Sequence, residues 1–61
     1  MYKYRVYFKF VVNGEIMEEL TDVEGRSESH ACLMAGAWLA TVGSMTMREL
    51  LDVYGVLAEL N

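Results

Sequence analysis

The Asn13-Gly14 dipeptide, flanked on both sides by alternating apolar residues, is the feature that most constrains this chain. A type I′ turn needs a positive φ at both central residues, and Asn-Gly accepts that conformation at the lowest cost. A two-residue loop pairs Val12 with Glu15, and every further cross-strand pair follows by counting. The sequence therefore predicts an antiparallel β-hairpin of defined register.

The predicted register gives the hairpin, over residues 2–12 and 15–23, two different faces. The core face pairs Phe10 with Met17, Phe8 with Glu19, Val6 with Thr21 and Tyr4 with Val23. The outward face pairs Val11 with Ile16, Lys9 with Glu18, Tyr7 with Leu20, Arg5 with Asp22 and Lys3 with Glu24. Three bases thus meet three acids, which a register shifted by one residue would not give. Glu19 is the exception on the core face, and we expect either the margin of the helix-covered area or a β-bulge there.

The length of the chain sets a limit on its stability. Sixty-one residues make one domain, residues 1–61, and a domain of this size buries only about 60% of its unfolded surface. The single cysteine, Cys32, cannot form an intramolecular disulfide, and no cluster of Cys and His suits structural zinc. Because 54% of the residues are apolar, we expect oligomerisation to supply the missing stability.

A helix is predicted over residues 28–42. Gly25 and Arg26 end the second strand, Ser27 is a favourable N-cap, and Gly43 suits the C′ position. The face expected to cover the sheet consists of Ala31, Met34, Ala35, Trp38, Leu39 and Val42.

The opposite side of this helix carries almost no charge. Leu33, Ala37, Ala40 and Thr41 lie there, and a helix that is apolar all round is buried on more than one side. Small residues such as alanine let another backbone approach closely. Two elements can cover this side of the helix: a C-terminal helix of the same chain, or the equivalent helix of a second copy in a dimer.

The C-terminal residues fit two structures. Thr46 and Glu49 match a capping box, and helical spacing follows it. The apolar residues at that spacing are Met47, Leu50, Leu51, Tyr54, Leu57 and Ala58. Gly55 costs such a helix about 1 kcal/mol. A third strand over residues 52–60 is favoured instead by Val53, Tyr54 and Val56. We predict an α+β fold in which two helices follow the hairpin (ββαα), with a three-stranded ββαβ arrangement as the alternative.

No set of residues predicts catalysis or a cofactor. His30 and Cys32 diverge by roughly 200° on a helix, so they form neither a metal site nor a nucleophile-base pair. Glu18 and Glu19 are neighbours on a strand and point to opposite faces. No glycine pattern fits a phosphate loop. We therefore expect a protein that is not an enzyme and holds no cofactor.

The longest segment without charge is residues 29–47, but its purely apolar part is too short for the roughly 20 residues of a membrane span. The N-terminal residues follow a strand pattern and lack the apolar region of a secretory signal. We expect a cytoplasmic protein with no membrane association.

A patch of cross-strand apolar residues on the outward face suggests function. Tyr7, Val11, Ile16 and Leu20 form this patch, and contiguous apolar patches mark interfaces. With the second helix side formed by Leu33, Ala37 and Ala40, they make up the predicted interface. The leading hypothesis is a small homo-oligomeric protein-binding module, acting as adaptor, assembly element or inhibitor of a larger protein. A compact acidic domain of this kind also suits a virus-encoded inhibitor.

The charge distribution provides the alternative hypothesis. The net charge is −4, and Glu15, Glu19 and Glu28 belong to an acidic stretch. Such a chain could mimic nucleic acid and block the DNA- or RNA-binding groove of a target protein. Direct binding of nucleic acid through the basic residues of the first strand is disfavoured, because the net charge repels phosphates and acids face those bases.

Overall fold

The Asn13-Gly14 turn joins strands β1 (Tyr2–Val12) and β2 (Glu15–Gly25), and its residues have φ angles of 51° and 80°. The computed structural model describes all 61 residues. Every cross-strand pair predicted from the turn is present, so the register is confirmed. The β1–β2 ladder runs without a shift, which rules out a bulge at Glu19. That side chain is half-exposed on an edge strand, at the margin of the helix-covered area.

The C-terminal part of the chain corrects the leading fold prediction. The capping box starts α2 (Met47–Leu51) as predicted: the Glu49 amide donates to Thr46 Oγ1, and the Thr46 amide donates to Glu49 Oε1. That helix ends after five residues, and β3 (Val53–Leu60) pairs antiparallel with β1. The order of elements is ββααβ, and the sheet order is β2-β1-β3. The alternative with three strands correctly predicted a strand in residues 52–60, where β3 covers residues 53–60. The leading prediction, a long second helix, was wrong.

A β-bulge explains why the third strand was hard to see in the sequence. Lys9 lies opposite Gly55, but its neighbour Phe10 lies opposite Val53, so Tyr54 is an extra residue in β3. One extra residue breaks the period-two alternation by which strands are identified. From Gly55 to Leu60 the pairing with β1 continues without a further shift.

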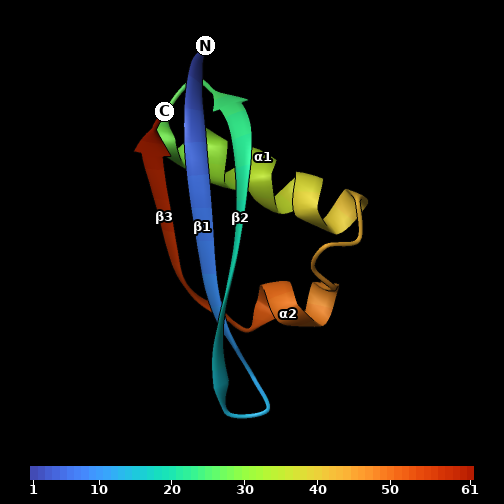
Figure 1. The fold of residues 1–61 in the computed structure, drawn as a ribbon. Coiled ribbons are helices and arrows are strands. Elements are labelled where there is room, and N and C mark those ends of the chain that lie inside the picture. Colours follow the sequence, from blue (N-terminus) through green and yellow to red (C-terminus); the bar gives the residue numbers. More distant parts are fainter.

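Helix α1 (Glu28–Thr41) crosses one face of the sheet (Figure 1). It begins at the predicted residue and ends one residue before the predicted Val42, while Gly43 is the C′ residue as predicted. Ser27 Oγ accepts a hydrogen bond from the His30 amide at 3.2 Å. Val42 is the C-cap, and Gly43 has a φ of 76°, the left-handed conformation that glycine supplies at C′.

The core lies between β1 and the helices. Its members are Tyr4, Val6, Phe8, Phe10, Ala31, Ala35, Leu39 and Met45. Three residues predicted for the covering face of α1, namely Met34, Trp38 and Val42, remain about half exposed. Figure 1 shows the reason, because α1 runs obliquely and its C-terminal half extends past β2, where no sheet lies beneath it.

The outer side of α1 has no cover within the chain. Leu33 is 73% exposed, and Ala37 and Ala40 are also exposed. The explanation by packing against a C-terminal helix is therefore wrong, since that helix is only five residues long. Contact across a dimer stays a prediction.

Two glycine substitutions should have opposite effects on stability. A Cβ at Gly25 would lie 2.9 Å from both the Cα and the backbone nitrogen of Ala31, so Gly25→Ala must push β2 away from α1. We expect a loss of about 1–3 kcal/mol in the free energy of unfolding, as for other overpacked cores. Gly36→Ala places its Cβ 4.0 Å from the Phe8 ring and should stabilise the helix by about 0.5–1 kcal/mol. Urea denaturation of both variants measures the two effects, and equal stabilities would contradict the close approach at Gly25.

Candidate functional site

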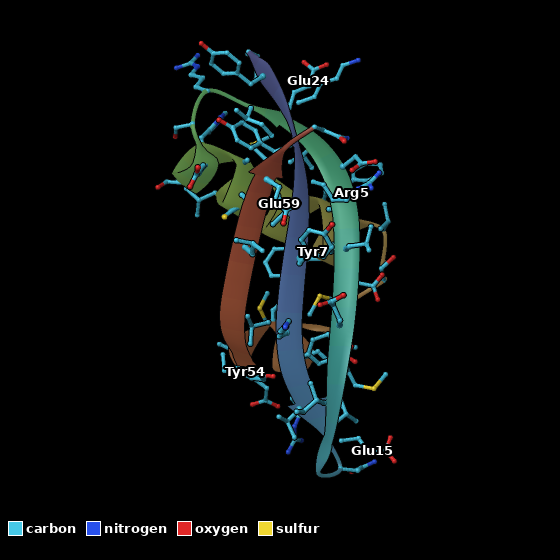
Figure 2. All side chains as sticks on the ribbon, turned by 60° about the vertical axis from the view of Figure 1, so that its left-hand side comes forward. Arg5, Tyr7, Glu15, Glu24, Tyr54 and Glu59 are labelled. Atoms are coloured by element: carbon cyan, nitrogen blue, oxygen red, sulfur yellow. The ribbon has the colours of Figure 1, made fainter.

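One face of the sheet carries no helix. The core residues of β1 occupy the other face, where α1 packs and where Leu50 of α2 joins the same core cluster. Figure 2 shows Arg5, Tyr7 and Glu59 on the side of the sheet away from α1. We call this side the open face. It is the outward face predicted from the hairpin, widened by β3.

A row of three apolar side chains crosses the open face. Tyr7 lies opposite Leu20 of β2 and opposite Leu57 of β3. Leu20 and Leu57 are 48% and 55% exposed, and Tyr7 between them is half-buried. We call these three residues the central row. Side chains directly opposite in antiparallel strands lie about 5 Å apart, so the row forms one continuous apolar strip.

Charged side chains flank the central row on both sides. On one side Arg5 lies between Asp22 and Glu59, and on the other Lys9 lies between Glu18 and the bare backbone of Gly55. A basic central strand thus runs between acidic positions of the edge strands. This arrangement gives the apolar row a polar rim, as in many protein interfaces.

Arg5 and Asp22 form the one ion pair in the structure. Arg5 Nε donates to Asp22 Oδ1 at 2.9 Å, and Arg5 Nη2 donates to Asp22 Oδ2 at 3.3 Å. The hydrogen bond from Arg5 lowers the pKa of Asp22 below its ordinary 3.8. Asn61 Nδ2 donates to the same carboxylate at 3.4 Å, which links the C-terminus to this corner of the open face.

A shallow hollow of about 380 Å³ lies beside the central row. Its lining residues are Tyr7, Lys9, Glu18, Gly55, Val56, Leu57 and Glu59. Gly55 brings no side chain to the hollow, and a Cβ at this position would lie in ordinary van der Waals contact with Lys9 Cβ, at 4.0 Å. The hollow is therefore suited to one side chain of a partner, with apolar and charged groups on its walls.

The structure divides the predicted interface into two surfaces. Tyr7 and Leu20 lie together in the central row, and Val11 with Ile16 continues the apolar face toward the hairpin turn, beyond Val53, the first residue of β3. The residues Leu33, Ala37 and Ala40 lie on the outer side of α1, on the other side of the molecule from the open face. Sequence reasoning missed Leu57 and Gly55, which only the strand interpretation of residues 52–60 could have placed beside Tyr7.

The predicted acidic set does not form one cluster. Glu15 lies at the start of β2 beside the hairpin turn, and Glu19 lies within β2 on its helix-covered face. Glu28 is the first residue of α1, which follows the other end of β2. In Figure 2, Glu15 and Glu24 mark the two ends of β2. The acids are instead spread along one strand, since β2 carries five of them in 11 residues.

His30 and Cys32 take up structural positions near the start of α1. His30 Nδ1 accepts a hydrogen bond from the Arg26 amide at 2.9 Å, so this imidazole helps to hold the turn before the helix. Burial raises the pKa of the Cys32 thiol, and the nearby Glu28 carboxylate acts in the same direction. The thiol is thus held in its less reactive form. No group of three metal-binding side chains is present.

No protein-family model, curated protein or solved structure matches this chain. Neither helix has the length and apolar character to span a bilayer.

The Arg5–Asp22 pair should give stability a specific dependence on pH. The pKa of Asp22 is lowered in the folded state, so its contribution is present above the unfolded pKa and disappears as the pH falls through the folded value. Asp22→Asn should therefore lower the melting temperature at pH 7, and the difference from wild type should close below about pH 4. Because the pair is exposed, about 1 M salt should reduce the difference.

Glu24→Gln is the matched control for this experiment, because Glu24 lies opposite Lys3 and forms no ion pair. Thermal melts followed by circular dichroism at several pH values compare the two variants with wild type. A constant difference between Asp22→Asn and wild type at every pH would contradict the role of the ion pair.

Proposed function

We propose that this chain is a small homo-oligomeric protein-binding module that docks a partner protein on its open face. The observation that supports this most strongly is the central row of Tyr7, Leu20 and Leu57 within a charged rim. Tyrosine is enriched among the residues that dominate interface energies, and it is most effective when neighbouring apolar groups exclude water around it. The hollow beside Tyr7 supplies a place for a side chain of the partner.

The amount of exposed apolar surface supports the oligomeric part of the proposal. Sixteen large apolar side chains are exposed, twice the eight that form the core. The accessible surface of 4358 Å² also exceeds the roughly 4,000 Å² expected for a monomer of this mass. A chain with so little core and so much apolar surface gains stability by covering that surface with protein.

The acidic mimic remains the second candidate function, and the charge of β2 favours it. Five carboxylates lie along this edge strand, and only Asp22 is neutralised by an ion pair. In this alternative, the acids of β2 and the nearby Glu28 would occupy a basic groove on a target protein. Such a contact would weaken steeply with salt, whereas an apolar interface would not.

Replacing Tyr7 with alanine should distinguish the two functions. Tyr7 lies off the core face, so Tyr7→Ala should keep the fold but weaken partner binding by about 1 kcal/mol or more, because it removes the centre of the row. Tyr2→Ala is the matched control, since Tyr2 is another tyrosine of β1, is exposed, and lies outside the open face. Titration calorimetry against a protein captured by the wild-type chain measures both affinities.

Charge reversal tests the alternative with the same partner. If the acids carry the binding, Glu15→Lys and Glu28→Lys should abolish it, and raising the salt concentration should weaken the wild-type complex. Tyr7→Ala would then bind like wild type. That combination of results would reject the open face and favour the mimic.

A further inference from the structure

We propose that a second copy of this chain pairs with the outer edge of β3, antiparallel, so that two copies form one six-stranded sheet. The inference names the contact of the homo-oligomer in the proposed function and in that respect rests on it. The second copy is favoured by the uncovered edge of β3, the different charges of the two edge strands, and the continuity of the open face across the contact.

The outer edge of β3 is free along its length. In Figure 1 no element lies beyond β3, whereas α1 extends past β2 on the opposite side. Backbone groups in an antiparallel ladder alternate between the two neighbours of a strand. The Asn61 amide donates to the Lys3 carbonyl at 2.8 Å, so odd-numbered residues here direct their backbone groups toward β1. The backbone groups of Val56 and Ala58 therefore point outward, available to another strand.

The charges of the two edge strands differ in a way that selects β3. Natural proteins protect sheet edges with charges, bulges or covering elements. β2 carries five acids, so pairing it with its own copy would bring ten carboxylates into two adjacent strands. β3 has a single charged residue, Glu59, and no lysine or proline, and its bulge at Tyr54 lies before the regular stretch from Gly55 to Leu60. Only the edge of β3 can therefore pair with itself without a large electrostatic cost.

Symmetry excludes the mixed arrangement as a closed assembly. Pairing β3 of one copy with β2 of another is heterologous and leaves a free edge at each end, so it continues into a chain of copies. Pairing β3 with β3 uses the same residues on both sides and closes at two copies. The charged β2 strands then form the outer edges of the sheet, where their carboxylates oppose further growth.

The register centred on Leu57 pairs residues 55–59 of the two copies, all within the regular part of β3. It places Leu57 opposite Leu57 of the second copy, Val56 opposite Ala58, and Gly55 opposite Glu59. In this register each residue whose backbone groups point outward lies opposite another such residue, as in the pair of Val56 with Ala58. No two residues of like charge lie directly opposite each other. A register centred on Glu59 would instead set two carboxylates against each other, which is destabilising.

This register makes the central row continuous between the two copies. The two-fold axis is perpendicular to the sheet, so both sets of helices lie on one face and both open faces lie on the other. The apolar strip then runs from Leu20 through Tyr7 and Leu57 into the same three residues of the second copy. Six strands spaced about 4.8 Å apart give it a width of about 24 Å, compared with about 10 Å across the three strands of one chain.

Disulfide trapping tests the contact directly and needs no other partner. In a Cys32→Ala background, Leu57→Cys places two thiols opposite each other at a pair that is not hydrogen-bonded, where Cα atoms about 4.5 Å apart allow a disulfide. Leu20→Cys is the matched control, because Leu20 flanks Tyr7 from the other edge strand with similar exposure. Under mild oxidation, Leu57→Cys should form covalent dimer at least tenfold faster than Leu20→Cys, as measured on non-reducing gels. Equal rates, or a faster Leu20→Cys, would overturn the proposal.

Proline substitution tests the backbone pairing in the otherwise unmodified chain. Ala58→Pro removes an outward amide of β3, a position that an edge strand tolerates, and should convert a micromolar dimer to a monomer in sedimentation. Glu18→Pro removes an outward amide of β2 in the same way and should leave the dimer intact. A wild-type monomer at micromolar concentration, or a dimer that survives Ala58→Pro, would overturn the proposal. Should the proline variants fail to fold, the trapping rates decide. None of these results depends on whether Tyr7 binds another protein, so the two proposals can fail separately.

Discussion

The central strand β1 is the element on which the rest of the structure depends. It hydrogen-bonds to β2 on one side and to β3 on the other, and four of its side chains make up half of the buried core. Its alternate positions give the two faces their opposite characters, since Phe8 faces the helices and Tyr7 faces away from them. Every other element contacts this strand, and its period-two pattern separates the core face of the sheet from the open face.

A core with a single layer explains the composition of the open face. Both helices pack on the same side of the sheet, and the chain is too short to supply a second covering layer. The uncovered face must then remain compatible with water, and cross-strand charges achieve this at most positions, as in the row of Asp22, Arg5 and Glu59. The central row is the exception at the middle of this face, because each of the three strands contributes an apolar residue to it, and Val11 with Ile16 continues it toward the turn. An exception of this kind at the middle of a solvated face needs a functional explanation, whereas scattered apolar residues do not.

The sequence predicted local structure well because local rules govern it. The turn at Asn13 determines the whole β1–β2 register, and the caps at Ser27 and Thr46 depend only on residues within one helical turn. The position of β3 depends on a ladder to residues some 50 positions earlier in the chain, and the bulge at Tyr54 disturbs its alternation. The central row was therefore seen as the pair of Tyr7 with Leu20, and its third member was missed. Trp38 was misplaced for a related reason, because the helical period gives the side of α1 but not the point where the helix passes the edge of the sheet.

The two edges of the sheet differ in their chemistry, and this difference connects assembly with binding. In the proposed dimer the apolar strip is continuous only when β3 is paired, so a partner wide enough to use the whole strip binds the dimer more tightly than the single chain. By linkage, such a partner must stabilise the dimer by the same factor by which the dimer improves its binding. The apparent affinity then falls with the fraction of chain that is dimeric, so it depends on the concentration of the chain as well as on the contacts at Tyr7. In the proposed dimer, a small domain with no room for a second core layer would gain a wider binding surface from the same edge strand that completes its own sheet.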